Sequence, residues 1–219
     1  MHNTVQKYKD IISSIDKKLE EQKINSNPKV IAVSKTFKLE KILPLIEYGH
    51  LDYGENKVLE AIDKWSEIKQ KKKNIKLHLI GKLQTNKVKH ALKIFDYIHS
   101  VDSIKLAKKI ADEQNKQNKK PKLFIQVNIG DEQQKSGIKV DQIKDLITFS
   151  KKLDLNVIGL MCIPPVNEKP DYYFKEIKNL SKKFNLPEIS MGMSSDYLKA
   201  VQNSSTYLRI GSSIFGQRA

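Results

Sequence analysis

The sequence has little of what secreted and membrane proteins need. Cys162 is the only cysteine among 219 residues, so no intrachain disulfide can form and a reducing compartment is expected. No hydrophobic run approaches the length that crosses a bilayer. Residues 1–16 contain no apolar segment of the kind found in signal peptides. We therefore expect a cytoplasmic protein without a membrane partner.

Aromatic residues are also scarce, at 7% of the chain, and they are absent from two segments where lysines gather. These segments are IKQKKKNIK (68–76) and EQNKQNKKPK (113–122). The formal net charge of +15 suits a nucleic-acid partner, but proteins that bind single strands stack bases on aromatic side chains. We interpret the charge as a solvated, lysine-rich surface and expect no nucleic acid. A basic nucleic-acid-binding module is the alternative.

The nine glycines include no glycine-rich fingerprint behind the first apolar run. Eight such runs alternate with helical patterns. They are VIAVS (30–34), LDYG (51–54), KLHLIG (76–81), FDYIHS (95–100), LFIQVN (123–128), LNVIGLM (155–161), EISMG (188–192) and TYLRIG (206–211). This alternation predicts an α/β fold, a (β/α)8 TIM-type barrel in one domain over residues 1–219. A doubly wound open sheet is the alternative, but it usually carries the missing fingerprint.

An extra helix is predicted ahead of the barrel, over about residues 4–24, so that residues 1–28 form a leading helix and linker. Its apolar residues recur at helical spacing: Val5, Tyr8, Ile11, Ile12, Ile15 and Leu19. Pro170 is expected to open a later helix, at the position where its missing N–H costs least. Pro44 predicts a late start or a kink in the helical pattern over residues 39–48.

Polar and unusual residues follow seven of the eight predicted strands. They are Lys35, YGEN (53–56), IGKLQTNK (80–87), NIGDEQQKSG (128–137), MCIPP (161–165), MGMSSD (191–196) and RIGSSIFG (209–216). In a parallel barrel these strand ends share one face, where active sites are built. The sequence therefore predicts a functional site on that face.

The last two of these segments predict what the site binds. The chain turns at Gly192 and again at Gly211, and polar residues follow at the expected start of each helix. They are Ser194, Ser195, Asp196, Ser212 and Ser213. Free backbone N–H groups at helix starts bind anions, and glycine allows close approach. Helix capping explains either segment alone, but the pair, behind strands seven and eight, favours phosphate.

Lys35 lies at the end of the first predicted strand and faces this phosphate site. A lysine amine that is partly desolvated near other cations becomes a nucleophile. A lysine, a phosphate site and a barrel together suggest pyridoxal 5′-phosphate held as a Schiff base. A lysine aldolase that acts on a sugar phosphate fits the same residues.

Seven motifs in order resemble one known family. They are AVSKT, YGENKV, HLIGKLQTNK, VNIGDEQQKSGI, GLMCIPP, SMGMSSDYLKA and RIGSSIFG, between about Val30 and Gly216. The chain thereby resembles the pyridoxal phosphate homeostasis protein family, also called the proline synthetase co-transcribed homologue family. The resemblance implies a barrel like the N-terminal domain of alanine racemase and Lys35 as the Schiff-base lysine. The main departure is Cys162, where the family pattern has a threonine or alanine.

The resemblance also implies the residues that bind the cofactor. Ser190, Met193, Ser194, Gly211 and Ser212 would hold the phosphate, Arg209 would reach the pyridine nitrogen, and Asn56 would line the ring side. His78 either packs near the ring or is a satisfied core histidine. The remaining candidates are assigned to packing: Met161 and Met193 as apolar walls, Cys162 as an inert small hydrophobe and Trp65 as a core residue.

The implied function is intracellular cofactor homeostasis, by buffering or by delivery to apo-enzymes that use pyridoxal phosphate. We expect no catalytic residue and no metal site. An amino-acid racemase or decarboxylase that uses the cofactor is the alternative. Such barrel enzymes add a β-domain and dimerise to complete the site, whereas only residues 217–219 follow Gly216 here. We therefore expect a monomer without strong catalysis of its own.

Overall fold

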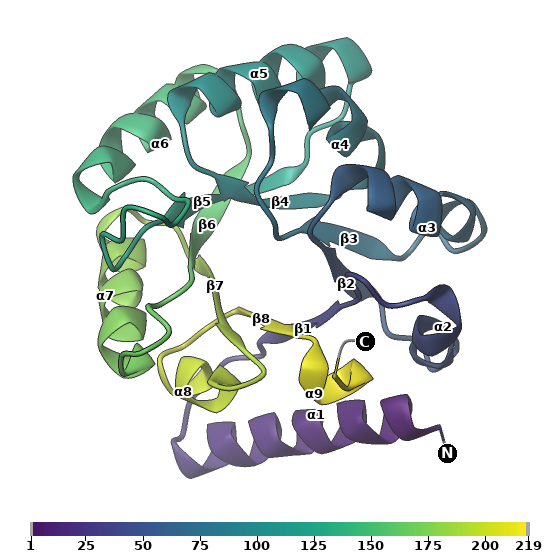
Figure 1. Cartoon of the computed structure of the whole chain (residues 1–219). Helices are drawn as coiled ribbons and strands as arrows, with labels where there is room; N and C mark the ends of the chain where they lie inside the picture. The colour runs from purple at the N-terminus through teal and green to yellow at the C-terminus, as the bar shows by residue number, and fades with distance from the viewer. Residues whose placement is uncertain (1, 218–219) are drawn as a thin grey trace.

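Eight parallel strands close into one barrel in sequence order (Figure 1). The computed structural model describes residues 2–217. The strands are β1 (Lys29–Val33), β2 (Asp52–Glu55), β3 (Lys76–Leu79), β4 (Tyr97–Val101), β5 (Lys122–Val127), β6 (Val157–Cys162), β7 (Glu188–Met193) and β8 (Tyr207–Ile210). Closure comes from the pairing of β1 with β8, in which Ala32 lies opposite Ile210. The predicted barrel is confirmed, and the open sheet is excluded.

Helices surround the barrel and follow the strands in alternation, as Figure 1 shows. They are α1 (Asn3–Glu21), α2 (Leu39–Glu47), α3 (Val58–Lys71), α4 (Val88–Ile94), α5 (Ile104–Gln117), α6 (Ile143–Lys152), α7 (Pro170–Lys183), α8 (Tyr197–Gln202) and α9 (Ser212–Phe215), with 3-10 turns η1 (Thr85–Lys87) and η2 (Val140–Gln142). Pro170 opens α7 as predicted. The helix α2 already begins at Leu39 and includes Pro44, so a late start is wrong, and the alternative of a kink stays a prediction.

The leading helix α1 completes the outer layer. It packs against α2, α8 and α9, and Figure 1 shows it beside α8 and α9. The helix α9 has only four residues and covers little of the sheet. Val5, Ile11 and Ile15 recur on one face of α1 and are buried there. The extra helix thus takes the place of a full-length eighth helix.

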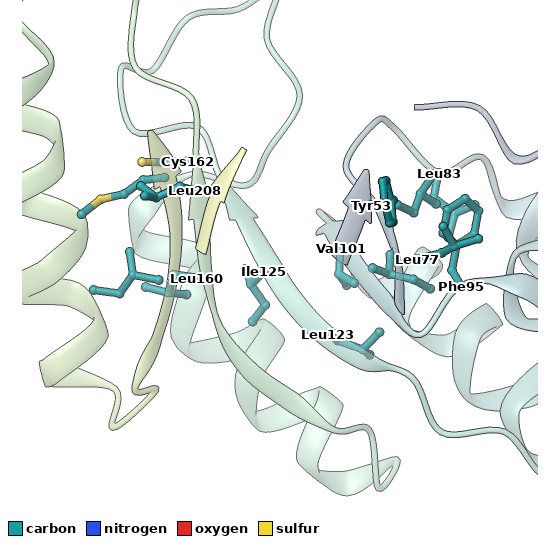
Figure 2. Packing of buried hydrophobic residues seen from close by; sticks show 14 of the residues in the cluster. Tyr53, Leu77, Leu83, Phe95, Val101, Leu123, Ile125, Leu160, Cys162 and Leu208 are labelled. Carbon is teal, nitrogen blue, oxygen red and sulfur yellow. The ribbon is translucent and has the colours of Figure 1, made fainter. Parts of the chain in front are cut away.

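Two separate apolar layers stabilise the barrel. The larger one fills the space between strands and helices, and Leu77, Leu123 and Leu160 belong to it (Figure 2). The smaller one lies inside the barrel. Its members are Ile31, Tyr97, Phe124, Met161 and Tyr207. Because side chains alternate along each strand, β1, β4, β5, β6 and β8 supply residues to both layers. In the part of the chain that the structure describes, no helix is long and apolar enough to cross a membrane.

Candidate cofactor-binding site

Lys35 lies in a turn two residues after the end of β1, and its side chain is partly buried. The next residue, Thr36, has φ +66, in the left-handed region that β-branched residues seldom adopt. The backbone N–H of Thr36 donates to Oε1 of Glu60 at 2.7 Å. A carboxylate from α3 therefore holds the turn in an uncommon conformation, directly beside the lysine.

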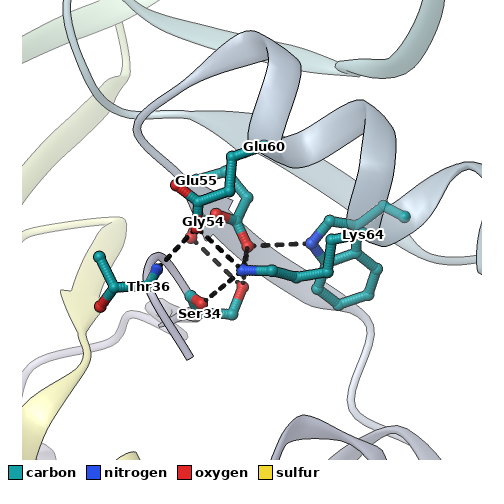
Figure 3. Close-up of polar contacts among 7 residues, drawn as sticks. Ser34, Thr36, Gly54, Glu55, Glu60 and Lys64 are labelled. Atoms are coloured by element: carbon teal, nitrogen blue, oxygen red, sulfur yellow. Dashed lines mark hydrogen bonds and ion pairs between the residues drawn. The ribbon is translucent and has the colours of Figure 1, made fainter. Parts of the chain in front are cut away.

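A buried polar cluster under this turn was not foreseen from the sequence (Figure 3). Glu55, fully buried at the end of β2, accepts three hydrogen bonds on Oε1. They come from the Ser34 hydroxyl at 2.7 Å, the Trp65 indole at 2.9 Å and the Lys64 ammonium at 3.0 Å. Lys64 also donates to the backbone carbonyl of Ser34 at 2.9 Å. These bonds tie the residue before Lys35 to both β2 and α3.

The cluster left only a weak signal in the sequence. Glu60 and Lys64 are spaced i, i+4 on α3 and form an ion pair at 3.1 Å, a pattern that usually means a solvated helix face. Glu55 was visible only as part of the YGEN motif. Trp65 is buried as predicted, and its indole N–H in addition satisfies Glu55. Hydrogen bonds hold the pKa of Glu60 below its ordinary value although partial burial opposes this, so the carboxylate stays charged.

The two loops predicted to bind phosphate meet each other. The backbone N–H groups of Gly211 and Ser213 both donate to Oγ of Ser194, each at 3.3 Å. Two backbone donors from the β8 loop thus converge on one oxygen supplied by the β7 loop. Ser212, between them, is exposed. This arrangement of donors fits an anionic oxygen of a phosphate.

The end of β7 has a demanding backbone. Gly192 was predicted to turn the chain after the strand, but it lies within β7, and the turn follows at residues 194–196. Its φ is +89, and a Cβ there would lie 2.5 Å from Cβ of Ala200, so this position requires glycine. Asp196 directly precedes α8 but makes no side-chain capping bond to it. Its Oδ1 instead accepts the backbone N–H of Met193 at 2.6 Å. The loop is therefore fixed by its own polar groups.

Arg209 lies buried in β8 with its guanidinium inside the barrel. It donates through Nη1 to Oγ of Ser190 at 2.7 Å and through Nη2 to the carbonyl of Cys162 at 2.9 Å. Ser190 was predicted to hold phosphate. Its contacts place it beside Arg209, which was predicted to face the pyridine nitrogen. That Ser190 holds the phosphate stays a prediction.

Other predicted residues have clear surroundings. His78 is buried and bonds Asp52 and His99 through its two ring nitrogens, so it is a satisfied core histidine. Burial raises the pKa of the Cys162 thiol to about 12, as expected of an inert cysteine. Met161 is buried inside the barrel, and Met193 is half-buried.

Asn56 follows β2 and is half-buried. It lines a cavity of about 320 Å³ together with Lys82 and Gln84. A Cβ on Gly81 would lie 2.4 Å from the backbone oxygen of Asn56, so the β3 loop approaches this residue closely. Among residues 2–217 no three histidine, cysteine or acidic side chains gather as metal ligands do.

Comparisons with known proteins show the family to which the chain belongs. Residues 15–219 match the family model described as alanine racemase, N-terminal domain. A pyridoxal phosphate homeostasis protein of Aquifex aeolicus is 34% identical over 227 residues, which cover 99% of each chain. PipY of Synechococcus elongatus PCC7942, solved with pyridoxal phosphate bound, superposes with a TM-score of 0.79 at 32% identity, over 92% of this chain and 100% of that one.

The fold is therefore that of the alanine racemase N-terminal domain. The chain belongs to the pyridoxal phosphate homeostasis protein family. An alanine racemase of Clostridium difficile 630 shares the fold alone, with a TM-score of 0.70 at 14% identity, and this chain covers 57% of its length.

Proposed function

We propose that this chain binds pyridoxal 5′-phosphate as a Schiff base on Lys35 and serves cofactor homeostasis. The observation that carries the proposal is the adjacency of β1 and β8. Ile31 pairs with Arg209, and a Cβ on Gly211 would lie 3.2 Å from Cβ of Val33. Lys35, Arg209 and Gly211 thus come from two paired strands or directly follow them, and Ser194 follows β7, which pairs with β8 on its other side. The PLP-bound structure of PipY supports the same ligand.

In this proposal each residue has a separate task. The N–H groups of Gly211 and Ser213 and the hydroxyls of Ser194 and Ser212 bind the phosphate, with Met193 beside them. Arg209 donates to the pyridine nitrogen. Three further residues complete the site: Lys35 as the covalent anchor, Asn56 on the ring side and Ser190 next to Arg209. Glu55 and Glu60, through the contacts described above, hold the turn that presents Lys35.

The arginine also explains why catalysis is expected to be weak. Bound pyridoxal phosphate supplies an electron sink, which is strongest when an acidic partner keeps the ring nitrogen protonated. Arg209 is charged and can only donate a hydrogen bond. It therefore favours an unprotonated ring nitrogen. We infer a monomeric cytoplasmic carrier, without nucleic-acid or membrane partners, that gives its cofactor to apo-enzymes.

Borohydride trapping tests the assignment. The purified protein should lose its visible absorption band on reduction, and peptide mapping should find one pyridoxyl phosphate on the peptide that contains Lys35. Lys35→Ala should abolish the label, whereas the matched variants Lys82→Ala and Lys87→Ala, on the neighbouring β3 loop, should retain it. Label on Lys82 or Lys87 with Lys35 unmodified would refute the assignment.

A further inference from the structure

A continuous line of polar side chains crosses the interior of the barrel. Asp52 lies at the amino end of β2, and its Oδ1 is 3.0 Å from Nε2 of His78. Nδ1 of His78 lies 3.0 Å from Nε2 of His99, whose Nδ1 lies 2.9 Å from Oγ of Ser190. Ser190 in turn accepts from Nη1 of Arg209 at 2.7 Å. Five residues from five strands are thus joined end to end.

The two imidazoles in this line are held rigidly. Both are fully buried. His78 stacks on Tyr97 with ring centroids 4.2 Å apart and planes 14° apart, and His99 stacks on Phe124 at 4.2 Å and 16°. Neither ring can rotate without losing its stacking partner and both hydrogen bonds. The order of donors and acceptors along the line is therefore fixed by protonation alone.

Protonation follows from burial. Burial lowers the pKa of His99 well below its ordinary value, and His78 and Arg209 nearby lower it further. Burial also lowers the pKa of His78, although Asp52 partly offsets this. Burial opposes ionisation of Asp52, but His78 and nearby cations outweigh it and lower the pKa of the carboxyl. Two neutral imidazoles thus lie between a carboxylate and a guanidinium.

These charge states permit one arrangement of hydrogens. The Asp52 carboxylate can only accept, so Nε2 of His78 carries the proton and its Nδ1 is an acceptor. Nε2 of His99 must then donate to His78, which leaves Nδ1 of His99 as an acceptor. The Ser190 hydroxyl donates to that nitrogen, so its oxygen offers a lone pair to Arg209. Every hydrogen bond along the line therefore points from Arg209 toward Asp52.

We propose that this line is a hydrogen-bond relay of fixed polarity that orients Arg209, with His99 as a positioning residue and Asp52 as its remote counter-charge. The proposal rests on the proposed function, since it concerns how the arginine is aimed at the pyridine nitrogen. Burial lowers the pKa of Arg209, and the nearby charge of Asp196 acts in the opposite direction. The relay, however, fixes one arm of the guanidinium, while the Cys162 carbonyl fixes the other at 2.9 Å. The two anchored arms set the plane of the guanidinium.

The relay can be tested without cofactor. In the full-length, 15N-labelled protein, two-bond 1H–15N correlations at neutral pH should show the Nε2–H tautomer for His78 and His99. The side-chain Nη signals of Arg209 should be resolved, because two anchored arms slow rotation. His99→Phe, which keeps an aromatic ring against Phe124, should make the Nη signals exchange-broaden or coalesce. The matched control His90→Gln changes an exposed histidine on α4 and should leave them unchanged.

Other results would overturn the relay. An Nδ1–H or cationic His99 at neutral pH contradicts the polarity, and unchanged Arg209 signals in His99→Phe contradict the positioning role. If His99→Phe fails to fold, Ser190→Ala provides the same comparison, because it removes the link between His99 and Arg209. The tautomer measurement on the unmodified protein applies in every case.

Cofactor titration separates the relay from the proposed function. His99→Phe and Ser190→Ala should each bind pyridoxal phosphate about threefold to tenfold more weakly, the range for one lost hydrogen bond. The double variant should bind no more weakly than the weaker single one, since both changes break the same relay. Unchanged affinity in both single variants would overturn the role in binding. Correct tautomers in a protein that binds no pyridoxal phosphate would refute only the proposed function.

Discussion

Replacing Lys64 with methionine removes one charge from the buried cluster beneath the Lys35 turn. Methionine keeps most of the apolar stem, so the change isolates the ammonium. The Glu55 carboxylate would remain fully buried with two neutral donors, Ser34 and Trp65. Its other oxygen, Oε2, already has no hydrogen-bond partner within the described residues. Breaking a buried pair in this way costs about 3–5 kcal/mol of unfolding free energy.

The complementary change should cost less and should rescue the first one. Glu55→Gln keeps an acceptor for the serine and indole donors and leaves Lys64 paired with Glu60 at 3.1 Å, so about 1–3 kcal/mol is expected. In the double variant Glu55→Gln/Lys64→Met no buried charge is left without a partner. It should therefore be more stable than Lys64→Met alone, by about 2 kcal/mol, within the range of measured coupling energies.

Thermal and urea unfolding of the cofactor-free proteins measure these differences. For a domain of this size the loss in Lys64→Met corresponds to a melting temperature lower by about 6–20 °C. Lys69→Met provides a matched control at the other end of α3, where the lysine pairs with the partly exposed Asp96. Additive effects of Glu55→Gln and Lys64→Met, or equal losses in Lys64→Met and Lys69→Met, would refute the view that a buried ion pair supports the turn.

Three further outcomes are expected. Ser194→Ala and Ser212→Ala should each weaken pyridoxal phosphate binding by about 1–2 kcal/mol in a titration, and pyridoxal should bind far more weakly than its phosphate; equal affinities would contradict the phosphate site. Burial lowers the pKa of His99 in the folded protein, and the neighbouring His78 and Arg209 lower it further. Below the ordinary histidine pKa of 6.5, the unfolded chain therefore binds more protons than the folded protein. Stability in urea should thus fall as the pH falls below 6.5, by up to about 1.4 kcal/mol per pH unit for this histidine, and His99→Phe should flatten the slope. Finally, the protein loaded with pyridoxal phosphate should exchange the α-proton of alanine no more than about 10²–10⁴-fold faster than free pyridoxal phosphate does. NMR in deuterium oxide measures this exchange. Turnover of L- to D-alanine at enzyme rates would instead establish a racemase.

Local pattern was enough to predict the barrel and the strand ends that carry the proposed site residues. The eight apolar runs, the amphipathic leading helix and Pro170 each depend on residues a few positions apart, and such spacing is visible in sequence. The expected late start at Pro44 failed because the apolar face of α2 is buried, with Ile42, Leu45 and Ile46 in the core. Tertiary packing there outweighs the lost backbone hydrogen bond.

By itself, the sequence determined that strands and helices alternate eight times and that Lys35, Ser194 and Gly211 follow strands whose ends share a face. Only the tertiary structure decided which polar groups meet. Ser34 and Glu55 are 21 residues apart, and His99 and Ser190 are 91 apart, yet each pair is hydrogen-bonded. Such pairs leave no periodic trace, because they depend on barrel closure and strand register. In the line of hydrogen bonds from Arg209 to Asp52, the direction of each bond depends on the carboxylate of Asp52 at its end. Only folding brings these residues into contact.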